Sequence, residues 1–307
     1  MKVWLLKLHR WIALAFALPL IFVIGSGLIL SVEPWLVDRS VVPDSLDAPR
    51  VLELMQQADP AGKATSLSYR SYDGTLTMSA GRGPGAGGTT VDVATGAAVP
   101  ERSALATLMG TARGIHERLA IDAGWLVTAS TLAMVVLIFI GILMGIPRIR
   151  NTVAGWHKAV AWGLLPLVVL SPLTGLCLAW GITFTGGLGA TGTQAALPSL
   201  TEAVQELGAE HDLSGLIFIR QQGPKLMARI DEGGEYKVYD VTKDGVTLMA
   251  RNWPRLWHEG DFAGIWSALL NLVTSVALIG LLVTGVWIWL RRNLKLRAAR
   301  AQRTARA

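Results

Sequence analysis

The chain has 307 residues, of which 51% are hydrophobic and only 16% are charged, and its mean hydropathy is positive. This composition is too apolar for an ordinary soluble domain of that size and indicates a membrane protein. The single cysteine, Cys177, excludes an intrachain disulfide, a CxxC motif and a cysteine-ligated iron–sulfur cluster. We interpret Cys177 as a small apolar residue within a helix.

Four apolar runs predict transmembrane helices, because each is long enough, at about 1.5 Å per residue, to cross a hydrocarbon core of about 30 Å. In chain order they are residues 11–32, 124–146, 159–184 and 262–290. The first run follows a basic N-terminal segment but lacks an A-x-A cleavage site, so we expect a retained helix and not a signal peptide.

The distribution of charge predicts the orientation of these helices. Residues 1–10, 147–158 and 291–307 carry 3, 3 and 7 Lys or Arg and no acidic residue, which leaves 15 of the 28 basic residues and all 22 acidic ones elsewhere. Basic segments stay in the cytoplasm, so we expect both termini inside and the two long connections outside. The basic tail needs no nucleic-acid partner, since anionic lipid is sufficient.

Each long outside connection is predicted to contain one short helix followed by three strands. The first set is a helix over residues 50–58 with strands at 66–72, 76–80 and 89–93, and the second is a helix over 200–208 with strands at 215–220, 225–230 and 236–241. The glycine-rich residues 81–88 are typical of a hairpin tip. They do not match a phosphate loop, because no Lys-Ser/Thr follows.

The chain also contains an internal repeat. The first span, HRWIALAFALPLIFVIGSGLIL from His9, aligns without a gap with the third, HKAVAWGLLPLVVLSPLTGLCL from His157. The second and fourth spans match more loosely, each with a histidine eight or nine residues before a tryptophan, at His116 and His258. Because both halves start inside, we predict two parallel repeats.

Four of the five histidines therefore stand at the predicted start of a span, His9 and His157 inside and His116 and His258 outside. Buried charged histidine is costly, so four in register favour a ligand role over simple interfacial anchoring. One imidazole from each repeat at each face fits bis-imidazole ligation of haem iron. A helix N-terminus disfavours imidazolium and so suits a ligating histidine. A zinc or copper site is the rival, but it needs three or four converging ligands.

Small residues in each span would allow either a macrocycle or a neighbouring helix to approach closely. They are Gly25 and Gly27, Gly141 and Gly145, Gly163 and Gly175, and Gly280 and Gly285.

Four motifs carry a family resemblance: LHRW at residues 8–11, GIHERL at 114–119, GWHK at 155–158 and LWHEGDFAGIW at 256–266. Together they resemble the PepSY-associated transmembrane family over nearly the whole chain. Members include di-haem ferric-siderophore reductases of the inner membrane of Gram-negative bacteria. The resemblance implies two b-type haems, one held by His9 and His157 on the cytoplasmic side and one by His116 and His258 on the periplasmic side. His211 matches none of these motifs, and we expect a surface residue.

The implied fold is a membrane α-helical protein, a four-helix transmembrane bundle of two parallel repeats with two small α+β PepSY-like periplasmic domains. The expected division is a transmembrane helix at 1–32, a periplasmic domain at 33–113, a helix at 114–147, a cytoplasmic loop at 148–158, a helix at 159–184, a periplasmic domain at 185–256, a helix at 257–290 and a basic cytoplasmic tail at 291–307.

The resemblance implies an inner-membrane electron-transfer protein, a ferric-siderophore reductase, which reduces a periplasmic ferric siderophore and so releases iron. A separate cytoplasmic reductase or quinol would donate the electrons, because no GxGxxG motif follows a strand and the tail is short. Two alternatives stay open. One is a haem relay to copper, a quinone or a periplasmic redox protein, and the other is a non-redox scaffold or binding protein.

Overall fold

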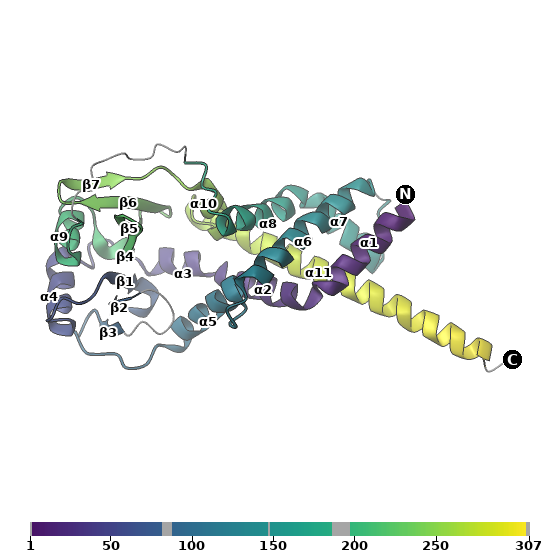
Figure 1. Cartoon of the computed structure of the whole chain (residues 1–307), viewed down its shortest axis with the longest axis horizontal. Helices are drawn as coiled ribbons and strands as arrows, with labels where there is room; N and C mark the ends of the chain where they lie inside the picture. The colour runs from purple at the N-terminus through teal and green to yellow at the C-terminus, as the bar shows by residue number, and fades with distance from the viewer. Residues whose placement is uncertain (1, 82–87, 147, 186–196, 305–307) are drawn as a thin grey trace.

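The computed structural model describes residues 2–81, 88–146, 148–185 and 197–304. A helical region occupies one end of the molecule and a β-sheet with two covering helices the other, and the C-terminal helix projects beyond the helical region on the side away from the sheet (Figure 1). Most of the predicted glycine-rich tip lies outside the described residues. The strands on either side of it pair, with Ser79 opposite Gly88.

The helical region is formed by six helices. They are α1 (Lys2–Ala15), α2 (Ala17–Leu30), α6 (Gly124–Leu143), α7 (Val153–Gly163), α8 (Leu165–Ala179) and α11 (Gly264–Thr304). Among the described residues, three helical stretches are long and apolar enough to cross a membrane, Ala17–Ser40, Gly124–Leu143 and Gly264–Thr304. The pair α7 and α8, bent by 69°, makes a fourth if it is one span.

The first and third predicted spans are broken, at the same position of the two segments aligned from His9 and His157. The breaks fall at Phe16, between α1 and α2, and at Leu164, between α7 and α8. Proline accounts for both, because it has no N–H to continue the helical hydrogen bonds and its ring clashes with the preceding turn. Pro19 and Pro166 lie in the first turns of α2 and α8.

Three further helices, which the sequence analysis did not anticipate, lie between the sheet and the helical region (Figure 1). They are α3 (Glu33–Ser40), α5 (Ala104–Arg118) and α10 (Trp253–Glu259). Residues 33–40 continue the first span after a short turn, whereas α5 and α10 precede the second and fourth spans as separate helices that end in left-handed residues, Leu119 and Gly260.

The strands of both outside connections join in one antiparallel sheet of order β3-β2-β1-β4-β5-β6-β7. The strands are β1 (Ser66–Arg70), β2 (Thr75–Ser79), β3 (Gly88–Asp92), β4 (Leu216–Gln222), β5 (Lys225–Asp231), β6 (Tyr236–Thr242) and β7 (Gly245–Leu248). The six predicted strands are present and β7 was missed. The two sets meet where β1 pairs with β4, with Leu67 opposite Ile219. The sequence analysis did not anticipate this pairing.

One face of the sheet is covered by α4 (Ala48–Ala58) and α9 (Leu200–Glu210), on the side away from the helical region (Figure 1). Alternate strand residues point to this face, so Leu67, Ile219 and Ile230 are fully buried against Leu54 and Val204 of the two helices. Burying one such aliphatic side chain contributes about 1.5–3 kcal/mol. This core joins the two outside connections into one unit.

Gly208 of α9 allows the two covering helices to touch, since a Cβ added there would lie 2.5 Å from the Ala48 Cβ of α4. We predict that Gly208→Ala destabilises the sheet unit by about 1–3 kcal/mol, because overpacking outweighs the gain in helix propensity. Thermal unfolding in detergent measures the effect. The control is Gly110→Ala in α5, where the nearest side-chain atom is 3.7 Å away. An unchanged unfolding temperature for Gly208→Ala would contradict the prediction.

Candidate functional site

Two of the predicted histidines meet at the end of the helical region nearest the sheet. His116 of α5 and His258 of α10, here called the sheet-side pair, have ring centroids 5.9 Å apart and planes tilted by 41°. The sequence analysis placed both at helix N-termini, which is wrong, because each lies in the last turn of a separate helix that precedes the span. The argument from the positive end of a helix dipole therefore does not apply to them.

Each imidazole of the sheet-side pair is held by a backbone carbonyl of a neighbouring helix. The Nδ1 of His116 lies 2.9 Å from the Val23 oxygen of α2, and that of His258 lies 3.2 Å from the Ser171 oxygen of α8. Val23 and Ser171 occupy the same position of the two aligned segments. Because a carbonyl only accepts, Nδ1 carries the proton in both rings, which leaves the lone pair on Nε2.

Two glycines allow the rings to lie against these helices. A Cβ at Gly27 would come within 3.0 Å of the Cε1 of His116, and one at Gly175 within 3.1 Å of that of His258. Both contacts are tighter than ordinary van der Waals separation, so a larger residue would displace the imidazole. These glycines also correspond in the aligned segments.

The other two histidines lie at the end of the helical region away from the sheet and are here called the distal pair. His9 of α1 and His157 of α7 are close enough to interact electrostatically. The Nδ1 of His157 lies 2.8 Å from the Thr284 hydroxyl of α11. The Nδ1 of His9 is buried and forms no hydrogen bond of good geometry, and the Leu137 backbone offers it only a weaker one.

A buried ionic group connects the sheet to the sheet-side pair. Glu259 follows His258 and accepts hydrogen bonds from Arg229 of β5 at 3.0 Å and from Arg255 of α10 at 2.6 Å. The Arg229 side chain is only 11% exposed. On the other helix, Arg113 of α5 pairs with Glu33 of α3. The position of each histidine-bearing helix is thus tied to neighbouring elements by charged contacts that sequence reasoning missed.

The described residues contain no group of three or more His, Cys, Asp or Glu placed to hold a metal ion. His211 is separate from both pairs. It was predicted on the surface, but its side chain is 19% exposed, with Nδ1 2.9 Å from Glu232 and the ring 4.3 Å from Tyr239.

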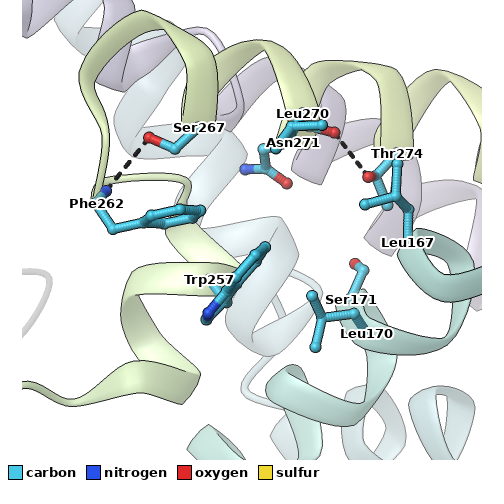
Figure 2. Close-up of a pocket in the computed structure, with 9 residues that line it drawn as sticks. All are labelled: Leu167, Leu170, Ser171, Trp257, Phe262, Ser267, Leu270, Asn271 and Thr274. Carbon is cyan, nitrogen blue, oxygen red and sulfur yellow. Dashed lines mark hydrogen bonds between the residues drawn. The ribbon is translucent and has the colours of Figure 1, made fainter.

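A small pocket adjoins the sheet-side pair between α8, α10 and α11 (Figure 2). Trp257 and Phe262 line it, with ring centroids 4.4 Å apart, together with Ser171, whose carbonyl binds His258. The cavity volume is ≈ 20 Å³. That is enough for about one water molecule, so this pocket is too small for a macrocycle.

Comparison with protein families matches residues 6–292 to the PepSY-associated TM region family. The chain belongs to this family, which confirms the resemblance carried by the four histidine motifs. It is a membrane protein with several apolar helices and a small antiparallel sheet. Comparison with curated proteins gives no significant match.

Asp231 lies where the sheet meets the helical region, and burial, with the nearby carboxylates of Asp38 and Glu232, raises its pKa to about 6. A raised pKa means that the carboxyl group favours folding when protonated and that this contribution is lost as the pH rises through about 6. We predict that Asp231→Asn raises the free energy of unfolding at pH 8 by about 1–3 kcal/mol and raises the unfolding temperature with it. Near pH 4 the substitution should have little effect on either quantity.

The control for this prediction is Asp244→Asn in the exposed β6–β7 turn. Thermal unfolding of both variants at several pH values checks it. Equal stabilisation of Asp231→Asn at pH 4 and pH 8 would show that burial of the charge is not the cause.

Proposed function

We propose that the chain is a di-haem electron-transfer protein of the bacterial inner membrane that reduces a ferric siderophore on the periplasmic side. The sheet-side pair would bind one b-type haem and the distal pair the other. The observation that carries the proposal is the geometry of His116 and His258, two imidazoles from different halves of the chain whose ring centroids lie 5.9 Å apart.

This separation suits two axial ligands. An imidazole nitrogen binds a metal ion at about 2.0–2.1 Å and lies about 1 Å from the ring centre, so two rings on opposite sides of one ion have centres roughly 6 Å apart. Both rings of the sheet-side pair have Nδ1 committed to a carbonyl and Nε2 left for a ligand. Such a second-shell hydrogen bond fixes the tautomer and makes the imidazole a better ligand.

Bound haem supplies reversible one-electron transfer at its iron. The contribution of the chain is to hold four neutral imidazoles in fixed orientations within an apolar region. A buried apolar cluster lies between the residues that contact the sheet-side pair and those that contact the distal pair. It consists of Leu20 and Ile24 of α2, Val168 of α8, and Ala277 and Leu278 of α11. This cluster excludes water between the pairs and provides a low-dielectric surrounding.

The proposal includes the orientation of the chain in the membrane and its two parallel repeats. With both termini in the cytoplasm, the basic segments 1–10, 147–158 and 291–307 lie inside and the sheet lies in the periplasm. Four transmembrane helices in two parallel repeats then put one histidine from each repeat at each face. The sheet-side pair would serve the ferric siderophore, while a separate cytoplasmic reductase or quinol would supply electrons at the distal pair.

The first test is the absorption spectrum of the purified protein with a haem-to-protein ratio. We expect a Soret band, two haems per chain, and loss of one haem in His116→Ala plus His258→Ala and of the other in His9→Ala plus His157→Ala. No Soret band in the wild type, or two haems surviving in either double variant, would refute the proposal.

The acceptor is tested separately by reoxidation of the dithionite-reduced protein. We expect ferric siderophores to reoxidise it faster than copper, a quinone or a periplasmic redox protein does. A preference for one of those acceptors would identify a haem relay with another target. If the double histidine variants lack haem but keep their cellular function, the protein is instead a scaffold or binding protein.

We also predict that Gly27→Ala weakens haem binding at the sheet-side pair, because the added Cβ would press on His116 and disturb its bond to the Val23 carbonyl. Disturbing a second-shell contact typically costs about 10–100-fold in metal affinity. The control is Gly25→Ala in the same helix, where nothing lies within 4 Å of the added Cβ. Haem titration of the two variants should differ, and identical affinities would contradict the role of Gly27.

A further inference from the structure

We propose that Thr284 is a positioning residue for His157, and that the isoleucine at the corresponding place, Ile140, leaves His9 the more weakly held ligand of the distal pair. This inference rests on the proposed haem ligation. It concerns a difference between two halves of the chain that the family resemblance does not address.

The hydroxyl of Thr284 can only accept from His157. Its proton is directed to the Gly280 carbonyl, one turn earlier in α11, at 2.6 Å. The lone pair of the same oxygen therefore faces the Nδ1 of His157 at 2.8 Å, and Nδ1 must be the donor. This chain of two hydrogen bonds fixes the tautomer of His157 and leaves Nε2 as the ligand atom. The neighbouring Gly285 gives the ring room, with an added Cβ 3.6 Å from Cε1.

The corresponding stretch of α6 lacks this hydroxyl. Residues 137–141, LIFIG, align with residues 281–285, LLVTG, so Leu137 matches Leu281 and Gly141 matches Gly285. The backbones of Leu137 and Leu281 lie near His9 and His157 respectively, which supports the alignment in space. Ile140 then takes the place of Thr284, and it is 4% exposed.

His9 shows the consequence. Its Nδ1 is buried and forms no hydrogen bond of good geometry, with only a weaker one offered by the Leu137 backbone, whereas the Nδ1 of His116, His157 and His258 each has at least one. An acceptor on Nδ1 orients an axial imidazole and raises its basicity, which favours iron(III) over iron(II). His157 is therefore the firmly oriented, more basic ligand of the distal pair, and His9 is the weaker one.

The experiment is a redox titration of purified protein with both haems bound, for Thr284→Val, Thr284→Ser and Ile140→Thr. Thr284→Val removes the acceptor at nearly constant volume and should raise the midpoint potential of the distal haem. Thr284→Ser retains the hydroxyl and should restore it. Ile140→Thr supplies an acceptor to His9 and should lower the potential. A tenfold change in the ratio of iron(III) to iron(II) binding corresponds to about 59 mV for a one-electron couple.

The sheet-side haem is the internal reference, because its potential should not move in any of these variants. The distal wave is identified as the one that His157→Ala abolishes. The matched control is Thr274→Val, since Thr274 is in the same helix and bonds to its helix carbonyl at 2.7 Å in the same way.

Opposite shifts in Thr284→Val and Ile140→Thr support the inference. The inference is also supported if Thr284→Val loses only the distal haem while Thr284→Ser keeps it. Unchanged distal potentials in both Thr284→Val and Ile140→Thr overturn it, provided that two haems are bound. A wild type that binds no haem refutes the proposed function itself, so the two failures are distinguishable.

Discussion

The contact on which the sheet-side pair depends is the hydrogen bond from a histidine Nδ1 to a helix carbonyl. The carbonyl oxygens of Val23 and Ser171 lie within apolar helices, and each accepts a hydrogen bond from a histidine of a different helix. A ring can reach such a carbonyl only where no side chain of that helix lies in the way. Gly27 and Gly175 leave this room. This contact decides the tautomer, and the tautomer decides which nitrogen keeps a free lone pair.

The sheet affects that contact from a distance. Because β1 pairs with β4, the two outside connections form one sheet with one core, and β5 is held in a fixed position by this core. Arg229 of β5 bonds to Glu259, the residue after His258. Removing Glu259 would leave the buried Arg229 guanidinium without its carboxylate partner, which is costly. The Arg229–Glu259 ion pair therefore ties the sheet to α10. Unfolding of the sheet would change the position of His258 relative to His116.

The sequence predicted the parts of this arrangement that depend on local pattern. Apolar length indicated the spans, and alternation indicated six of the seven strands. The ungapped alignment of the first and third spans singled out His9 and His157, and the looser match of the second and fourth spans singled out His116 and His258. It did not predict α5 and α10 as separate helices, because each ends in a left-handed residue only a few residues before a span, where the apolar pattern dominates. It also missed the β1–β4 pairing and the Arg229–Glu259 contact, since both join residues far apart in the sequence and neither has a periodic signal.

The predicted repeat would give two equivalent histidines in each pair. The sheet-side pair approaches this, with matched carbonyls and matched glycines on both halves. The distal pair departs from it at one position, where Thr284 faces Ile140 in the alignment. Isoleucine is β-branched like threonine but larger, and it supplies no acceptor, so one hydrogen bond is lost at this position. If the pairs bind haem as proposed, the substitution gives one of the two haems an unequal pair of axial ligands. The two haems would then differ in potential even though the segments that hold them align in sequence, and a difference in potential between them would give electron transfer a preferred direction.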